Sequence, residues 1–191
     1  MQSFEEYMKN LKQWLQDTAD SQLEEMSDFF TKRLHDYEEH MAIWEKSYRI
    51  FAEVLPLECQ KILDLGCGTG LALDKESLHH FLPERKEELY RKIYCSLKQG
   101  GIFILGDYIA CCNEEEELLR GVHLNKRKQS AIPENCYVHF DIPLTLEHEK
   151  ELLQNAGFVI EKVLDGSATI IIAGKGSGQT SSCTSSKATV I

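Results

Sequence analysis

The sequence predicts an α/β fold, and three observations carry this prediction. A short apolar run at 61–65 ends directly in glycines, as is typical of a buried parallel strand. A second apolar run at 102–105 follows a helical segment that begins near Pro83. Two further runs, 158–164 and 168–173, are separated by the sequence Asp-Gly-Ser and predict an antiparallel hairpin.

The N-terminal 55 residues predict helices only. Residues 3–24 have an amphipathic helical pattern whose apolar positions recur at three- and four-residue spacings: Phe4, Tyr7, Met8, Leu11, Trp14 and Leu15. Ser27 is a candidate cap of a second helical stretch. Its apolar face comprises Phe30, Leu34, Tyr37, Met41, Trp44 and Tyr48, and we expect it to break before Pro56.

The remaining elements follow in order along the chain. After Pro83, a helix is predicted by Leu89, Ile93 and Leu97 up to Gly100. Residues 114–130 form a charged helical pattern, and 143–156 predict a helix capped by Thr145 and stopped by Gly157. We therefore predict one domain over 1–174, with a helical lid at 1–55, an α/β core at 61–174 and a disordered, Gly/Ser/Thr-rich tail at 175–191.

Charge and composition exclude several classes of protein. The 191 residues carry a formal net charge of −10 without a dense basic stripe, which disfavours a nucleic-acid partner. No apolar stretch is long enough to span a membrane and the N-terminus lacks a signal pattern, so we expect no membrane partner and a cytoplasmic location. The seven cysteines include no CxxC pair, which favours reduced thiols over a disulfide framework or zinc site.

The glycines that follow the first strand indicate a ligand loop. Gly66, Gly68 and Gly70 permit a tight turn and let backbone N–H groups approach a ligand closely. A dinucleotide site requires G-x-G-x-x-G and an acidic residue about 20 positions further on. Here the third glycine comes one residue earlier, and Glu84, Glu87 and Glu88 lie in a helical, charged segment. The pattern therefore disfavours a dinucleotide-dependent oxidoreductase.

The loop resembles motif I of the class I S-adenosylmethionine-dependent methyltransferases. The matching residues are Asp64, Leu65, Gly66, Cys67, Gly68, Thr69 and Gly70. Later segments agree with the family in their order along the chain. Residues 77–81 resemble the segment that leaves the fourth strand, and residues 97–101 resemble the LKPGG turn, with Gln99 in place of the proline. Residues 152–158 resemble the last helix. The N-terminal segment, with Phe29, Phe30, Arg33, Tyr37, His40 and Met41, is similar to the lid of a bacterial small-molecule subgroup. The resemblance covers roughly residues 26–174.

This resemblance implies a Rossmann-like sheet, S-adenosylmethionine as cofactor and methyl transfer to a small-molecule acceptor. It assigns cofactor binding to Asp64, Leu65, Gly66, Cys67, Gly68, Thr69 and Gly70, with Tyr37 and Arg33 approaching from the lid. It does not identify a catalytic residue. By position His79, His80 and Tyr108 are candidates, each with packing at a strand end as the alternative.

The resemblance also has a gap. Only seven residues separate Gly70 from Leu78, where the family places a helix and strands two to four. We therefore expect a truncated sheet of order 1-5-7-6, in which strand one is an exposed edge that favours a homodimer. The acid that holds the cofactor ribose has no counterpart here. The alternative function is consequently a non-catalytic methyltransferase remnant that acts as a binding or self-association module.

The remaining polar residues predict no metal site. Asp107 is expected at the polar rim of the cofactor site. His139-x-Asp141 and the solitary His35, His123 and His148 have no ligand companions at metal-binding spacing, so we expect them to be surface or core residues.

Overall fold

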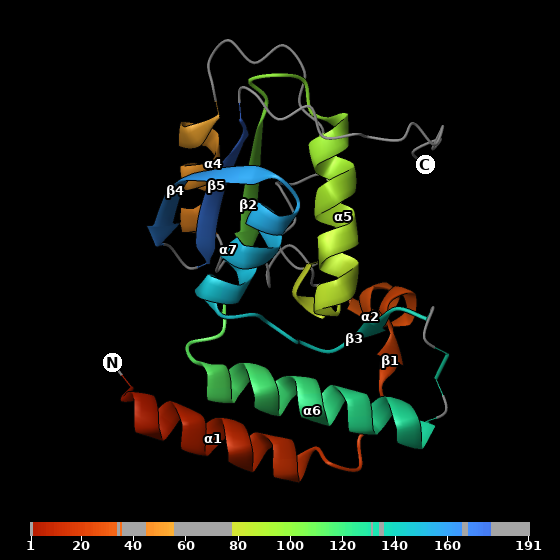
Figure 1. Ribbon diagram of the computed structural model, residues 1–191. Coiled ribbons are helices and arrows are strands. Elements are labelled where there is room, and N and C mark those ends of the chain that lie inside the picture. The colour runs from red at the N-terminus through yellow and green to blue at the C-terminus, as the bar shows by residue number, and fades with distance from the viewer. Residues whose placement is uncertain are drawn as a thin grey trace.

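The computed structural model of the chain describes residues 2–33, 35, 45–55, 78–130, 132–133, 136–165 and 168–176 (Figure 1). Three predicted features lie outside the described residues: the strand at 61–65, the glycine loop with Asp64, Leu65, Gly66, Cys67, Gly68, Thr69 and Gly70, and the lid residue Tyr37. The expected disordered tail also lies almost wholly outside them.

A three-stranded antiparallel sheet forms the centre of the described structure. Its strands are β2 (Ile102–Asp107), β4 (Phe158–Asp165) and β5 (Thr169–Lys175), in the order β2-β5-β4. The predicted hairpin is confirmed, since β4 pairs with β5 antiparallel from Phe158 opposite Lys175 to Asp165 opposite Thr169. If β2, β4 and β5 are strands five, six and seven of the expected order 1-5-7-6, the observed order β2-β5-β4 agrees with its last three members. The full order stays a prediction, because its first strand is not described.

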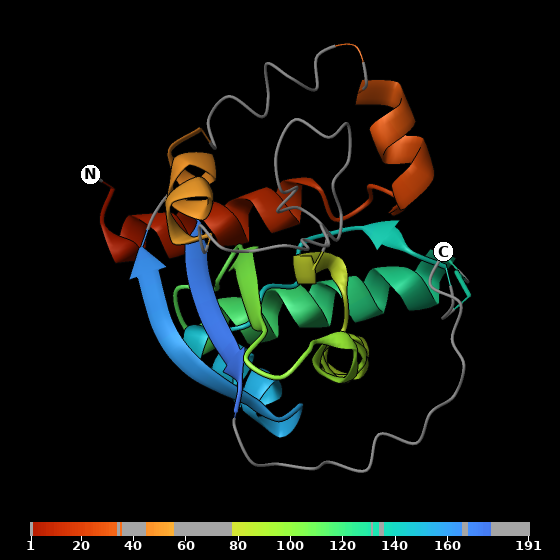
Figure 2. The same cartoon turned by 90° about the horizontal axis from the view of Figure 1, so that it is seen from above.

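Two helices cover one face of this sheet. They are α5 (Pro83–Ser96) and α7 (Leu146–Asn155), which begin and end close to the predicted positions. Their apolar side chains form one core with the sheet: Tyr90, Tyr94, Leu105, Leu153, Ala156, Phe158, Ile171 and Ala173. A further helix, α4 (Glu45–Val54), lies on the other side of the sheet from α7 (Figures 1 and 2).

The buried face of α5 differs from the predicted one. Lys86, Tyr90 and Tyr94 are fully or almost fully buried, whereas Leu89 and Ile93 are only partly buried. The buried face is thus displaced by one residue, because two tyrosines and a lysine stem fill the space against the sheet that the leucine and isoleucine were expected to fill. This displacement places an ammonium group in the core.

A second layer consists of α1 (Phe4–Asp17) and α6 (Asn113–Ser130), which run side by side in the same direction (Figure 1). Ser3 caps α1 by accepting from the Glu6 amide at 3.2 Å. At the other end the ammonium of Lys126 donates to the carbonyls of Thr18 and Ser21, both at 2.7 Å. Because these carbonyls follow the last turn of α1, Lys126 fixes the point where the chain leaves that helix.

Short elements connect the two layers. β1 (Glu24–Glu25) pairs with β3 (Val138–His139), and α2 (Met26–Arg33) and η2 (Leu78–His80) lie next to this ribbon (Figure 2). The prediction that Ser27 caps a helix is wrong: α2 begins at Met26, and the Ser27 carbonyl accepts from the Thr31 hydroxyl at 2.6 Å inside it. At the start of α2 the Met26 amide donates to the Tyr137 carbonyl at 3.0 Å.

The expectation of reduced thiols is wrong at Cys95 of α5, which is disulfide-bonded. Cys111, Cys112 and Cys136 are free. The spacing of cysteines in a sequence does not show which of them lie close together in the fold, and the prediction therefore missed this disulfide.

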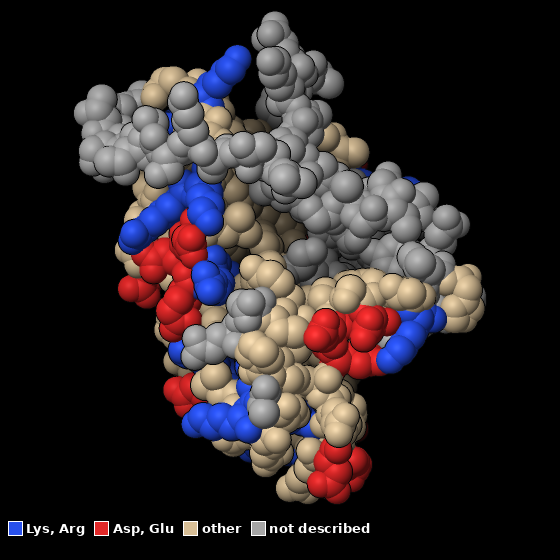
Figure 3. All heavy atoms as spheres, turned by 90° about the vertical axis from the view of Figure 1, so that its right-hand side faces the viewer, with Lys and Arg blue, Asp and Glu red and all other residues tan. Residues whose placement is uncertain are grey.

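Acidic and basic side chains lie intermixed on the face shown in Figure 3 rather than in one basic area. Along α5 they form ion pairs three or four residues apart, such as Arg85 with Glu88 at 3.3 Å and Lys92 with Glu88 at 2.9 Å. Among the helices of the described ranges, none is long and apolar enough to cross a membrane.

Gly157 provides a test of how α7 is joined to β4. Its φ is +105°, and a Cβ there would lie 3.0 Å from the Tyr94 ring. We expect Gly157→Ala to lower the free energy of unfolding by about 1–2 kcal/mol in urea denaturation, from left-handed backbone strain and this close approach. Gly121→Ala is the control, because a Cβ at Gly121 meets no atom within 4 Å. Equal stabilities for the two variants would contradict this account.

Candidate functional site

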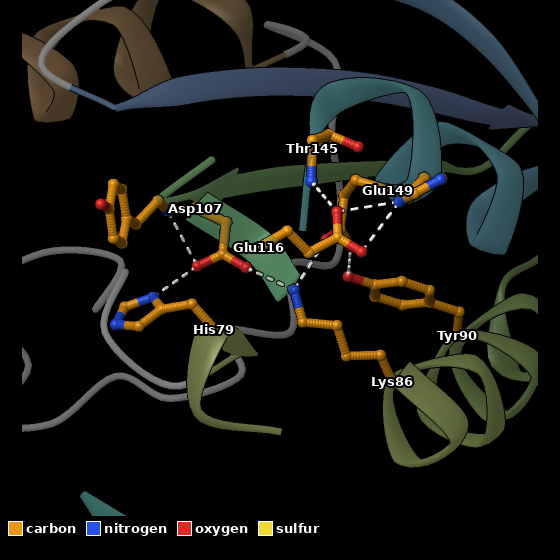
Figure 4. A network of polar contacts seen from close by, with 9 residues as sticks. His79, Lys86, Tyr90, Asp107, Glu116, Thr145 and Glu149 are labelled. Carbon is orange, nitrogen blue, oxygen red and sulfur yellow. Dashed lines mark hydrogen bonds and ion pairs between the residues drawn. The ribbon is translucent and has the colours of Figure 1, made fainter. Parts of the chain in front are cut away.

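A buried ammonium group organises the end of β2. Lys86 of α5 places Nζ 3.0 Å from Oδ2 of Asp107, the last residue of β2, and 2.7 Å from Oε2 of Glu149 on α7 (Figure 4). All three side chains are fully buried. Three of the elements that form the core, α5, β2 and α7, therefore each contribute one charge to the same point.

Further polar groups complete this arrangement, which we call the Lys86 cluster: Lys86, Asp107, Glu149, Tyr90 and His79. The Tyr90 hydroxyl donates to Oε1 of Glu149, and Nδ1 of His79 lies 2.6 Å from Oδ1 of Asp107. Every carboxylate oxygen in the cluster thus accepts at least one hydrogen bond from a neighbour. The prediction that Asp107 lies at a polar rim is wrong, because it is needed in the core as a counterion.

Electrostatics favour the charged forms of Asp107 and Lys86. Burial opposes a charged carboxyl, but Lys86 and His79 outweigh it and hold the pKa of Asp107 below its usual value. Burial likewise opposes the Lys86 ammonium, yet Asp107 and Glu149 raise its pKa. For His79, burial is outweighed by the charge and hydrogen bond of Asp107, so its pKa is raised as well.

Tyr108, a predicted candidate for catalysis, lies just beyond Asp107. Its hydroxyl is 2.9 Å from that of Tyr7 on α1, and it donates to Glu115 of α6. Burial and this hydrogen bond raise the pKa of Tyr108 far above its ordinary value, and the same causes raise the pKa of Tyr7 to about 12. The phenol therefore stays protonated, and it joins α1 and α6, the two helices of the second layer, to the end of β2.

His79 and His80, the other two candidates, lie together in η2. The backbone positions them, because the Ile142 amide donates to the His79 carbonyl at 2.7 Å. His80 is 6 % exposed, and neither of its ring nitrogens has a hydrogen-bond partner among the described residues. Burial and the charge of His79 lower the pKa of His80 to about 3, so the ring is neutral.

Asp141 joins these two histidines. Its Oδ1 lies 3.7 Å from Nε2 of His79 and 3.4 Å from Nδ1 of His80. The expectation that Asp141 has no ligand companions is wrong, because they come from a segment far earlier in the chain. The backbone contact between η2 and the loop after β3 brings the two segments together.

His148 and His123 contact neighbouring side chains. His148 lies 2.8 Å from both oxygens of Glu116, which also accepts from the Thr145 amide at 2.7 Å. The Thr145 hydroxyl makes no cap bond, so Glu116 takes the predicted capping role at the start of α7. His123 is buried on α6 against Phe140.

Local patterns missed most of the site, although one signal was present. Lys86 falls four residues before Tyr90 and eight before Tyr94, on the face of α5 that the tyrosines define. A lysine at such a position requires a buried counterion, and an aspartate at the end of the next strand is the nearest candidate. Glu149 and Asp141 carry no comparable signal.

Chemically, the arrangement presents oriented imidazoles at the carboxyl end of a strand. His79 is oriented through Nδ1 by Asp107, while the ring nitrogens of His80 make no hydrogen bond within the described part of the chain and Nδ1 lies 3.4 Å from Asp141. Such groups can hold a substrate, move a proton or bind a metal ion.

Comparison with known proteins gives a distant relation. No protein-family model matches the chain. The chain is 30% identical over 99 residues to carboxy-S-adenosyl-L-methionine synthase of Nautilia profundicola, a match that covers 48% of this chain and 42% of that enzyme. The match thus spans less than half of the relative's length. It supports the class I methyltransferase family at most, and indicates coarsely an enzyme related to S-adenosylmethionine.

Replacing the buried ammonium tests the Lys86 cluster. Lys86→Met leaves Asp107 and Glu149 without their common counterion, and we expect a loss of about 3–5 kcal/mol in the free energy of unfolding by chemical denaturation. Lys92→Met removes an exposed ion pair with Glu88 on the same helix and should leave the stability nearly unchanged. A Lys86→Met protein as stable as the Lys92→Met protein would contradict the assigned role.

His123 gives a prediction about pH. Burial and the neighbouring Arg127 lower its pKa from the ordinary 6.5 to about 4, so the folded state holds the neutral ring. The unfolded chain takes up the proton first, so this contribution to stability is complete above pH 6.5 and is lost as the pH falls towards 4. Between pH 7 and 5 the parent should lose on the order of 1 kcal/mol more than His123→Gln in urea denaturation. Identical pH dependence in the two proteins would refute the assignment.

Proposed function

We propose that this protein binds S-adenosylmethionine and transfers its methyl group to a small-molecule acceptor, as a truncated class I methyltransferase. The observation that carries the proposal is the Asp64–Gly70 sequence directly after an apolar strand pattern. The distant relative supports it, since that enzyme's name contains a carboxylated derivative of S-adenosylmethionine. The acceptor class follows from the resemblance to small-molecule methyltransferases alone.

The groups at the end of β2 lend further support to this proposal. In a methyltransferase the sulfonium methyl is already activated, so catalysis consists largely of holding the acceptor in line with it. His79 and His80 lie on η2, where the hydrogen bond from the Ile142 amide to the His79 carbonyl fixes the backbone. The contact between His79 and Asp107 keeps this turn beside the end of the strand. Two fixed imidazoles at this position suit the placement of a polar acceptor.

Binding of S-adenosylhomocysteine, followed by isothermal titration calorimetry, tests the proposal. We expect micromolar affinity in the parent protein and none in Gly68→Asp, because a side chain there would occupy the space of the cofactor. Gly121→Asp on α6 is the matched control, since a Cβ at this position meets no atom within 4 Å. Its affinity should equal that of the parent.

Two outcomes would count against this function. No heat at millimolar ligand would favour the alternative, a non-catalytic module that binds a partner or a second copy of the chain. Binding that Gly68→Asp leaves unchanged would place the ligand away from the glycine loop.

A further inference from the structure

Three possible metal ligands from two distant segments meet at one point. His79 and His80 come from η2, and Asp141 from the loop that follows β3. One ligand atom from each residue lies within 4.8 Å of the other two. Ligands about 2.0–2.2 Å from a shared ion are about 3.3–3.6 Å apart in a tetrahedral site, so side-chain rotations that bring the three atoms somewhat closer would close the site.

His79 already has the second contact that a metal-binding histidine requires. Its Nδ1 lies 2.6 Å from Asp107, which directs Nε2 towards Asp141. Histidines that bind metals commonly donate their other ring N–H to a carboxylate, which fixes the ring and increases its basicity. Lys86 in turn holds Asp107 in place, so the orientation of His79 depends on an ion pair in the core (Figure 4).

His80 supplies an independent observation. Its side chain is 1 % exposed, and both ring nitrogens are without a hydrogen-bond partner in the part of the chain that the structure describes. Its ring packs between those of His79 and His139, with centroids 4.3 and 4.6 Å away. A buried polar group without a partner is costly, and coordination of an ion removes that cost.

The charge of the surroundings suits a cation. The carboxylates of Asp107, Asp141 and Glu149 outnumber the one neighbouring ammonium, that of Lys86, so negative charge is in excess around the two imidazoles. A divalent ion neutralises this excess. Solvent reaches one of the three ligands, because the Asp141 side chain is 47 % exposed.

We propose that His79, His80 and Asp141 form a binding site for a divalent first-row transition metal ion. Two imidazole nitrogens and one carboxylate oxygen match the ligand preference of Zn²⁺, Fe²⁺ and Co²⁺ rather than of Mg²⁺ or Ca²⁺. Three protein ligands leave positions for water or substrate, as in catalytic metal sites. This site does not depend on the proposed cofactor.

Titration of the full chain with Zn²⁺ and Co²⁺ tests the site. We expect one Zn²⁺ ion by isothermal titration calorimetry, and visible Co²⁺ absorption bands without a thiolate charge-transfer band. Asp141→Asn and His80→Gln should each weaken Zn²⁺ binding by about tenfold or more. Because Asp141 is half-exposed, its variant should fold even if His80→Gln does not.

Two control variants separate this site from other ligands. His148→Gln removes a histidine that is paired with a carboxylate but belongs to no such group among the described residues, and Cys111→Ser with Cys112→Ser removes adjacent free thiols. Both should bind Zn²⁺ like the parent. Unchanged affinity in Asp141→Asn, a thiolate band with Co²⁺, or no heat on titration with Zn²⁺ would each overturn the proposal.

Discussion

The ion pairs of Lys86 are the constraint on which the rest of the described structure depends. A buried ammonium can be kept charged only if counterions surround it, and here α5, β2 and α7 each contribute one member of the group. The register of these three elements is therefore coupled: a shift of any one of them would leave a charge in the core without its partner. Apolar packing of Tyr90, Tyr94, Leu153 and Phe158 stabilises the same three elements but specifies their positions less strictly.

The same constraint extends outwards to the candidate site. Asp107 uses one carboxylate oxygen for Lys86 and the other for His79, so the charge balance of the core also sets the orientation of an imidazole. The backbone bond between Ile142 and His79 then places Asp141 beside that ring. The salt bridge between Lys86 and Asp107 thus helps to place Asp141 at the surface. It acts through the contact of Asp107 with His79 and the backbone bond of His79 with Ile142.

Sequence patterns predicted the parts of the fold that depend on local periodicity. The hairpin of β4 and β5, the helix beginning at Pro83 and the charged helix α6 follow from apolar spacing, turn residues and proline alone. The burial of Lys86 and the meeting of Asp141 with His79 depend on contacts between distant segments, which no local pattern encodes. The cap of α7 shows the same limit: Thr145 occupies the predicted position, but the hydrogen bonds come from Glu116 on another helix.

The chemistry of the Lys86 cluster bears on whether the chain is an enzyme or a remnant. A buried ion pair is poor evidence for a purely stabilising role, because well-packed apolar residues of similar volume often stabilise a core equally well or better. The charges are instead effective where a neighbouring group must be held in one protonation state and one orientation, as at binding and catalytic sites. His79 is such a group, since it is bound to Asp107 and directed towards Asp141 and His80. We infer that the groups at the end of β2 serve binding or catalysis as well as stability.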